Sequence, residues 1–317
     1  MNPADQKWLL LDSASLYFRA FYGIPDTITS PAGEPVNAVR GFLDMVAHLV
    51  TKYRPTHLVA AWDDDWRPQW RVDAIPSYKA HRVAEFSGDT AVEEVPDALT
   101  PQVPVIADVL QAFGITRLGA AGCEADDVIG TLVARAVAAG VGRTDVVTGD
   151  RDLFQLVDDS NAVRVLYTAK GVRDLTEVDG AWLRDKYAIA SGPAYADLAV
   201  LRGDPSDGLP GVAGIGEKTA AKLLRQYGDL DGIIAAAKDG DRALAAGLRK
   251  KLLDAADYLD VAPRVVNVLR DADLPQVDAA VPARPSTQEQ LGELEQLAER
   301  WGVRSSINRV LEALPRH

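Results

Sequence analysis

Acidic side chains follow three of the apolar runs that resemble buried strands. Asp12, Asp63 and Asp150 each stand at or just after the end of such a run. A single acid in this place is usually a turn or helix-capping residue. Several of them meet at one edge of an open sheet, because the carboxyl ends of parallel strands form its ligand crevice. With Asp152 two residues beyond Asp150, they predict an acidic site at that edge.

Two further acidic clusters extend this set. Glu124, Asp126 and Asp127 begin a helical pattern, where the helix dipole also favours acids, and Asp204 and Asp207 form a pair that alone would be an ordinary turn. Nine carboxylates in one crevice would repel one another unless cations lay between them. Oxygen ligands without His or Cys select hard ions, Mg²⁺ or Mn²⁺. Two such ions about 4 Å apart are suited to in-line hydrolysis of a phosphodiester.

The overall charge agrees with this interpretation. The 317 residues include 34 bases and 46 acids, a net charge of -12, which by itself argues against a nucleic-acid partner. Without the nine clustered acids, 37 remain against 34 bases, so most of the excess belongs to the predicted site. One Cys and four His argue against a disulfide framework and a zinc site. No apolar run approaches the roughly 18 residues of a membrane span, and the amino terminus lacks a signal-peptide pattern. We therefore expect a cytoplasmic protein that contacts no membrane.

A glycine-rich segment, residues 209–220, is the second chemical signal. Its G-x-x-G-x-G spacing differs from a dinucleotide-binding fingerprint, and it is no P-loop because Glu217 separates Gly216 from Lys218. The spacing fits a helix–hairpin–helix, in which glycines allow close backbone approach and the next helix offers free N–H groups to a phosphate. A plain helix start at a crowded crossing is the alternative. The candidate residues for contact with a phosphate backbone are Gly211, Gly214, Gly216, Lys218, Thr219 and Lys222.

The pattern of apolar residues indicates how the chain positions these groups. Through residue 182, short apolar runs alternate with helical patterns, which is typical of an α/β fold with a central, mostly parallel sheet flanked by helices. The remainder is helical. The segment 79–100 shows neither strand alternation nor a compact turn, and its length predicts a functional lid or a disordered segment. The expected strands are residues 8–11, 57–62, 145–148 and 163–167, and the expected helices are residues 36–53, 100–113, 124–139 and 287–300.

Together these motifs resemble the bacterial-type 5′-nuclease or flap endonuclease family, which occurs free-standing and as the amino-terminal part of DNA polymerase I. The resemblance runs from Trp8 to about Leu314. The segments that carry it are residues 11–13, 30–36, 78–82, 124–127, 148–153, 203–207 and the glycine-rich segment. Because no polymerase region follows His317, the chain is similar to the free-standing members.

The resemblance implies a particular domain organisation. A PIN-like 5′-nuclease core would cover residues 1–182, with a helical arch at about 75–100. A helical region would cover residues 183–317 and pack with the core as one unit. Within it, a helix–three-turn–helix module at about 197–251 would hold duplex backbone, with K⁺ as a further candidate ligand of that module.

The resemblance also implies roles for the clustered side chains. Lys79 and Arg82 match the basic start of the arch, where they would contact the scissile phosphate and stabilise the transition state; otherwise they are solvated surface charges. The acids implied to surround a first metal ion are Asp12, Asp63, Glu124, Asp126 and Asp127, and those implied to hold a second are Asp150, Asp152, Asp204 and Asp207.

We therefore expect a Mg²⁺- or Mn²⁺-dependent 5′→3′ exonuclease and flap endonuclease of replication and repair. It would act as a monomer on 5′-flap, nicked or 5′-ended duplex DNA, with RNA-primed DNA as a further candidate substrate. One alternative is a PIN-type metal-dependent ribonuclease, against which the helix–hairpin–helix argues. The other is a non-catalytic DNA-binding scaffold, which predicts missing acids, whereas all nine are present.

Overall fold

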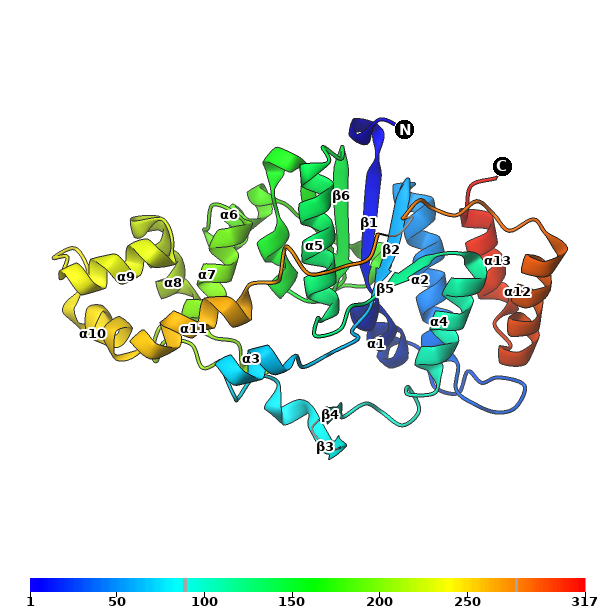
Figure 1. Cartoon of the computed structure of the whole chain (residues 1–317), viewed down its shortest axis with the longest axis horizontal. Coiled ribbons are helices and arrows are strands. Elements are labelled where there is room, and N and C mark those ends of the chain that lie inside the picture. Colours follow the sequence, from blue (N-terminus) through cyan, green and yellow to red (C-terminus); the bar gives the residue numbers. More distant parts are fainter. Residues whose placement is uncertain (88–89, 277–278, 317) are drawn as a thin grey trace.

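A six-stranded sheet forms the centre of the computed structural model, which describes residues 1–87, 90–276 and 279–316 (Figure 1). Its strand order is β5-β2-β1-β6-β7-β8, and neighbouring strands are parallel except for the antiparallel pair β7–β8. The strands are β1 (Lys7–Asp12), β2 (His57–Ala61), β5 (Thr116–Leu118), β6 (Arg143–Thr148), β7 (Val163–Tyr167) and β8 (Thr176–Val178). The carboxyl ends of β1, β2 and β6 point to the lower edge in Figure 1.

Helices bury both faces of the sheet because successive strand residues point to opposite sides. Leu10 of β1 belongs to the hydrophobic core under α5 (Ala125–Ala138) and α7 (Gly192–Arg202). Its neighbours Leu9 and Leu11 belong to the core under α2 (Asn37–Tyr53), α4 (Gln102–Phe113) and α13 (Arg304–Ala313). The helices of this part are α1 (Ser13–Gly23), α2 (Asn37–Tyr53), α3 (Gln69–Ala74), α4 (Gln102–Phe113), α5 (Ala125–Ala138), α12 (Gln288–Trp301) and α13 (Arg304–Ala313).

The remaining helices extend from one end of the sheet (Figure 1). They are α6 (Gly180–Tyr187), α7 (Gly192–Arg202), α8 (Glu217–Tyr227), α9 (Leu230–Asp239), α10 (Ala246–Asp254) and α11 (Ala256–Val266). We call residues 208–216, between α7 and α8, the glycine loop. No helix in the described ranges is long and apolar enough to cross a membrane.

The predicted α/β architecture is confirmed, including all four expected strands and all four expected helices. The sequence analysis missed the three-residue strands β5 and β8. Both lie at the edges of the sheet, where a strand pairs on one side only and needs few residues. Such short runs carry too little periodicity to be recognised.

The prediction of a helical arch at about 75–100 is wrong for the residues described there. That segment forms a short 3-10 turn, Ala80–Arg82, and then an antiparallel pair, β3 (Val83–Ser87) and β4 (Thr90–Glu93). The sequence between the two strands is Gly88-Asp89, a dipeptide typical of two-residue hairpin connections. Val, Phe and Thr in the flanking residues favour strand over helix. The pair lies below the carboxyl edge of the sheet in Figure 1.

Candidate active site

The fold brings acids from distant parts of the chain to the carboxyl edge of the sheet. Asp12 ends β1 and caps α1, where its side chain accepts a hydrogen bond from the Ser15 N–H at 3.1 Å. Asp63 follows β2 and accepts one from the Ala125 N–H at 2.8 Å, which joins it to the first turn of α5. Asp150 follows β6 and accepts one from the Asp152 N–H at 2.9 Å.

Two adjoining cavities lie between these acids. The larger, of about 490 Å³, is lined by six of the predicted acids and by one acid that the sequence analysis did not single out, Glu93 of β4. The six are Asp12, Asp63, Glu124, Asp126, Asp150 and Asp204. The smaller, of about 20 Å³, is lined by Glu124, Asp126, Asp152 and Asp207, so Glu124 and Asp126 belong to both. Eight of the nine predicted acids therefore share one acidic site, which we call the carboxylate cavity.

Burial and mutual repulsion oppose ionisation of several of these acids. Burial, together with the negative charges of Asp63 and Asp150, raises the pKa of Asp12 to about 7, although Thr148 partly offsets the shift. Burial and neighbouring carboxylates likewise raise the pKa values of Asp126 and Asp152 well above the usual range for Asp. This part of the cavity contains more negative charge than the protein itself neutralises.

A hydrogen bond connects two of the strand ends beneath this cavity. The fully buried Thr148 hydroxyl donates to Asp12 Oδ2 at 2.6 Å and accepts from the Asp150 N–H at 2.8 Å. One hydroxyl thus fixes the end of β1 against the end of β6. The sequence analysis assigned no role to Thr148.

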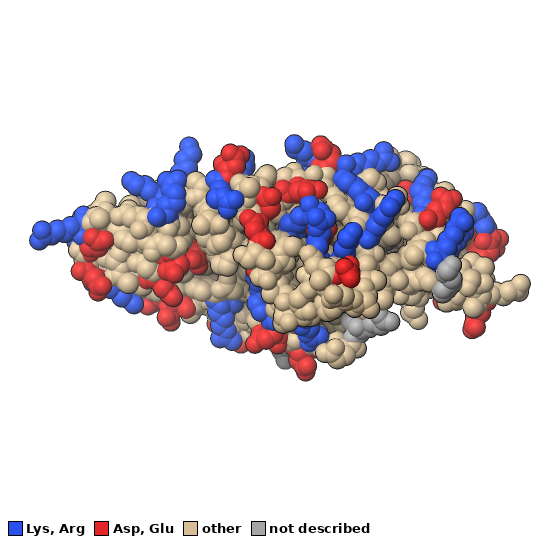
Figure 2. All heavy atoms as spheres, turned by 90° about the horizontal axis from the view of Figure 1, so that it is seen from above, with Lys and Arg blue, Asp and Glu red and all other residues tan. Residues whose placement is uncertain are grey.

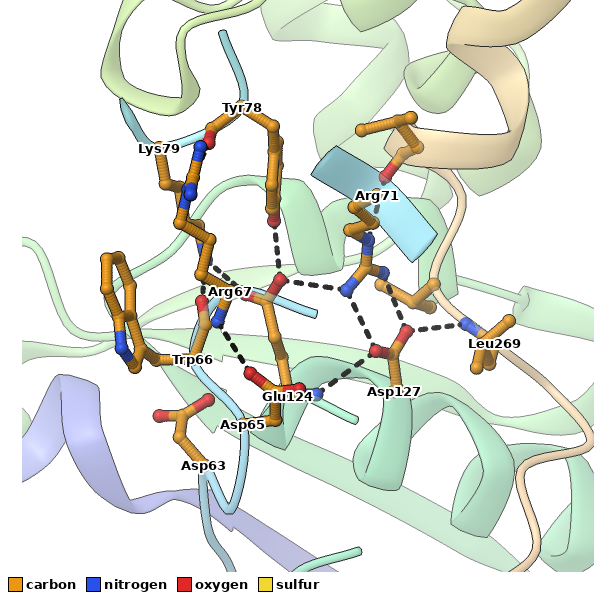
Figure 3. A network of polar contacts seen from close by, with 12 residues as sticks. Asp63, Asp65, Trp66, Arg67, Arg71, Tyr78, Lys79, Glu124, Asp127 and Leu269 are labelled. Carbon is orange, nitrogen blue, oxygen red and sulfur yellow. Dashed lines mark hydrogen bonds and ion pairs between the residues drawn. The ribbon is translucent and has the colours of Figure 1, made fainter. Parts of the chain in front are cut away.

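The part of the site around Glu124 is neutralised from within the protein (Figure 3). The Arg71 guanidinium, only 2% exposed, donates to Glu124 Oε1 at 2.8 Å and to both oxygens of Asp127 at 2.7 and 2.8 Å. The Tyr78 hydroxyl and the Lys79 ammonium also donate to Glu124. Burial raises the pKa of Glu124, but the positive charges of Lys79 and Arg71 lower it by more, so the net shift of its pKa is downward.

Arg71 is a functional residue that the sequence analysis missed. It also donates to the Val265 carbonyl at the end of α11 at 3.2 Å, so it joins α3, α5 and the helical region. The signal in the sequence was weak: large, mostly apolar residues, Ile75 and Tyr78, follow Arg71 at helical spacing, but α3 ends at Ala74 before either of them. A charged residue that is buried among apolar side chains needs a buried partner.

The prediction that Asp127 binds a metal ion is not supported by its position. Its carboxylate lines neither cavity. It is completely buried, and besides Arg71 it accepts hydrogen bonds from the N–H groups of Leu269 at 2.9 Å and Glu124 at 3.2 Å (Figure 3). Because successive residues of a helix are rotated by about 100°, Asp127 points toward Arg71 whereas Asp126 lines the cavities. We therefore leave Asp127 out of the candidate ligands.

Lys79 and Arg82 both line the larger cavity, as expected for cations that contact a substrate phosphate. Lys79 adopts a left-handed backbone conformation with φ of 46°, and its side chain is held against Glu124. Arg82 forms an ion pair with Asp207 at 2.8 Å and donates to the Ser206 carbonyl at 2.8 Å. Neither residue is a freely solvated surface charge.

The glycine loop joins α7 to α8 by close backbone contacts. A Cβ atom on Gly211 would lie 2.5 Å from the carbonyl of Arg202, and φ at Gly211 is +65°, so only glycine fits there. Gly214 has φ of +72°, and its carbonyl accepts a hydrogen bond from the Lys251 ammonium at 3.0 Å. Gly216 caps α8 without a side-chain hydrogen bond, and no atom lies within 4 Å of where its Cβ would be. Lys218 and Lys222, one turn apart on α8, are exposed, whereas Thr219 is half-buried.

The donor set of the carboxylate cavity fits hard divalent cations. It consists of carboxylate oxygens, with neither His nor Cys among the described lining residues. As they stand, no three acidic, His or Cys side chains in the described ranges could enclose an ion, so ligand side chains would have to turn inward. Elsewhere charge is mixed: Figure 2, which views the molecule from the amino end of β1, shows basic and acidic side chains interspersed.

Solved structures define the class of this fold. The bacteriophage T5 D15 protein co-crystallised with metal ions aligns over 97% of this chain and 99% of its own, with a TM-score of 0.63 and 16% identity. The catalytic core of Rad2 in complex with a DNA substrate aligns over 98% and 93%, with a TM-score of 0.57 and 18% identity. The chain therefore has a flap-endonuclease fold.

Sequence relatives identify the family within that class. Residues 7–188 match the family "5′-3′ exonuclease, N-terminal resolvase-like domain", and residues 191–289 match "5′-3′ exonuclease, C-terminal SAM fold". A 5′-3′ exonuclease of Streptomyces coelicolor is 59% identical over 96% of this chain and 99% of its own, and one of Mycobacterium tuberculosis is 52% identical over 96% and 97%. DNA polymerase I of Mycobacterium leprae is 45% identical over 71% of this chain but only 23% of its own length. The chain belongs to the 5′-3′ exonuclease family, which confirms the predicted resemblance and the hydrolase class.

Proposed function

We propose that this 5′-3′ exonuclease hydrolyses phosphodiesters of DNA at 5′ ends and at 5′ flaps, with the carboxylate cavity as its active site. The observation that carries the proposal is the convergence of eight acids from separate segments of the chain on two adjoining cavities. Family membership favours this function over the PIN-type ribonuclease and the non-catalytic scaffold. The relatives whose structures contain DNA are consistent with it.

The eight predicted acids that line the carboxylate cavity are the proposed ligands of two or more Mg²⁺ or Mn²⁺ ions. Such ions, when bound, generate hydroxide from water and stabilise the charge that develops on the phosphate oxygens. Their binding would also compensate the repulsion that raises the pKa values of Asp12, Asp126 and Asp152. The proposed metal ligands are Asp12, Asp63, Glu124, Asp126, Asp150, Asp152, Asp204 and Asp207.

The protein's own cations have the complementary task of binding the substrate phosphate. Lys79 and Arg82 line the cavity and can donate to phosphate oxygens, which orients the scissile bond over the acids. The free amino end of α8 and the exposed Lys218 and Lys222 would hold the duplex backbone without reading its sequence. K⁺ at the glycine loop stays a prediction; the Lys251 ammonium is already bonded to one loop carbonyl, that of Gly214.

Two adjacent acids offer a matched test of the active site. Asp63 lines the cavity, whereas the side chain of Asp64 is 42% exposed and forms a 3.8 Å ion pair with Arg117. We expect Asp63→Asn to abolish cleavage of a 5′-flap duplex in Mg²⁺ while binding of that DNA persists, and Asp64→Asn to cleave normally. Equal cleavage by both variants would refute the assignment of the cavity. A wild-type protein that cuts structured RNA but not flap DNA would favour the ribonuclease instead.

The proposed substrates are recessed 5′ ends, 5′ flaps and RNA-primed DNA. We propose all three activities, since the groups expected to contact the substrate, Lys79, Arg82 and the bound ions, would contact phosphates rather than bases. A time course on one duplex with a 5′ flap, a recessed 5′ end or a 5′ ribonucleotide tract measures each activity separately.

A further inference from the structure

Six tryptophans are present in the sequence, and Trp66 differs from the other five in its surroundings. The rings of the five each lie against an aromatic ring or an arginine; they are Trp8, Trp62, Trp70, Trp182 and Trp301. Trp66, in the segment between β2 and α3, has no such neighbour in the described part of the chain, and it belongs to neither hydrophobic core. The face of its half-buried indole can therefore stack on the ring of a bound molecule.

Trp66 nevertheless has a fixed position at the carboxylate cavity. Its Nε1–H donates to the Ala91 carbonyl of β4 at 3.2 Å, and its own carbonyl accepts a hydrogen bond from the Lys79 ammonium at 3.5 Å. Trp66 lines the larger of the two cavities, and Figure 3 shows its indole pointing away from the ion-paired network of Arg71 and Glu124. A rigid, flat and apolar surface in a cavity lined largely by charged groups is suited to stacking of a nucleobase.

Glu93 of β4 lines the same cavity. It stands two residues after Ala91, so both side chains lie on one face of that strand. It forms no hydrogen bond and no ion pair with any residue that the structure describes. The cations that act on its charge, Lys79 and Arg82, are paired with other acids. A half-buried carboxylate of this kind can accept hydrogen bonds from a bound molecule.

The position of Trp66 and Glu93 relative to α8 selects the part of the substrate that they contact. In Figure 1, α8 lies beside one end of the sheet, whereas β3 and β4 lie below the carboxyl ends of β1 and β2. We expect duplex to be held at α8 and its cut strand to cross the acids between these two places. A 5′-3′ exonuclease retains the duplex and releases the 5′ part of the strand. The nucleotide that reaches Trp66 and Glu93 is therefore the one 5′ of the cleaved bond.

We propose that Trp66 and Glu93 form a base-binding subsite for the unpaired nucleotide directly 5′ of the cleaved bond. This inference rests on the proposed function. The indole stacks on the base, and the carboxylate accepts hydrogen bonds from its Watson–Crick edge. Guanine offers two adjacent donors, N1–H and N2–H, whereas adenine and cytosine each offer one amino group and thymine one imide N–H. The efficiency of cleavage therefore depends on this base and is highest for guanine.

Two purines that differ by one hydrogen-bond donor test the role of Glu93. The substrates are 5′-flap duplexes that are identical except for the flap base next to the cleaved bond, which is guanine or hypoxanthine. Hypoxanthine lacks the 2-amino group of guanine. The kcat/KM in Mg²⁺ is measured for the wild type, Glu93→Gln and Glu94→Gln. Glu94 is the matched control, because it is the next residue along the chain, its side chain is exposed, and it lines neither cavity.

We expect the wild type to cleave the guanine substrate about fivefold more efficiently than the hypoxanthine substrate, the scale of one added hydrogen bond. Glu93→Gln should reduce this ratio to about one, and Glu94→Gln should keep it.

A wild-type ratio near one, or a ratio that Glu93→Gln leaves intact, overturns the subsite. An equal loss of cleavage of both substrates by Glu93→Gln, with the ratio kept, is the result if Glu93 binds a metal ion, and it overturns the subsite as well. If the wild type cleaves neither flap substrate, the proposed function itself fails, a result distinct from cleavage without base dependence.

A third substrate, with an abasic nucleotide at the same position, measures the contribution of Trp66. We expect the wild type to cleave the guanine substrate about tenfold more efficiently than the abasic one, the scale of one stacked base. Trp66→Leu should reduce this preference severalfold. Trp66→Phe keeps an aromatic ring but lacks the hydrogen bond to Ala91, and should retain most of the preference. If both variants lose the preference equally, Trp66 only holds β4 in place, and the subsite is overturned. Full preference in Trp66→Leu overturns it too.

Discussion

The two halves of the acidic site differ in how their charge is neutralised. Around Glu124 and Asp127, the buried Arg71 and Lys79 supply cations, and the pKa of Glu124 falls. Around Asp12, Asp126 and Asp152 the described protein supplies much less positive charge, and their pKa values rise. Acids that are neighbours in the sequence therefore have different tasks. The pairs with Arg71 and Lys79 hold α3 against α5, and we propose that Asp12, Asp126 and Asp152, together with Glu124, bind cations from solution.

Removing one carboxylate from each half should separate these tasks most sharply. Asp126→Asn should reduce Mg²⁺-dependent cleavage on the order of 10³-fold, or about 4 kcal/mol in the barrier. It should not lower the Tm measured in EDTA, because it removes a buried repulsion. Asp127→Asn, one residue away, should instead lower the Tm in EDTA. If Asp126→Asn unfolds the protein and Asp127→Asn does not, Asp126 rather than Asp127 is the structural carboxylate, and the assignment of the two halves is wrong.

The neutralised half should depend on Arg71 for its stability. Arg71→Met leaves Asp127 buried without its cation and Glu124 with Lys79 as its remaining cation, and should reduce the free energy of unfolding by about 3–5 kcal/mol. Adding Asp127→Asn to it should recover part of that loss, since one stranded charge disappears. Urea unfolding of the single and double variants measures both effects. If the loss in the double variant equals the sum of the losses in the two single variants, Arg71 and Asp127 do not stabilise the protein as a pair.

The half around Asp12, Asp126 and Asp152 should make the stability of the metal-free protein depend on pH in an unusual direction. An acid whose pKa is raised in the folded state binds protons that the unfolded state has released, so its contribution to stability is lost as pH rises. For Asp12, with a pKa of about 7 against 3.8, the loss extends from about pH 4 to 7. Glu124 has the opposite shift and loses its contribution only under more acidic conditions.

Urea unfolding in EDTA between pH 5 and 7 measures this dependence. We expect the free energy of unfolding to decrease as pH rises, and Asp12→Asn to reduce that slope. Mg²⁺ should stabilise the protein more at pH 7 than at pH 5, because protons compete for the same carboxylates. A slope that Asp12→Asn leaves unchanged would assign the effect to other groups.

The comparison also shows what could be predicted from the sequence. Strand ends marked by Asp12, Asp63 and Asp150 located the site, because parallel strands end at one edge and their apolar runs are easily recognised. Which of these acids the protein neutralises with its own cations, and which it leaves unneutralised, could not be predicted. Asp126 and Asp127 are adjacent in one acidic run, and only the packing of α5 against Arg71 separates them. The strands β3 and β4 were missed because the segment was judged by its length rather than by its β-branched residues.

The smallest expected effect concerns how the unneutralised half is held in place. Thr148→Val keeps the side-chain shape but removes the hydroxyl that joins Asp12 to the Asp150 backbone. We expect Mn²⁺ affinity, measured by titration without DNA, to fall about tenfold, as for other residues that orient metal ligands. Thr148→Ser should restore it, since serine supplies the same donor. Thr51→Val, which removes an equivalent hydroxyl from the distant helix α2, serves as the control. If Thr148→Val and Thr51→Val bind Mn²⁺ equally well, Asp12 is positioned by its helix cap alone, and burial rather than hydrogen bonding holds this half of the cavity ready for ions.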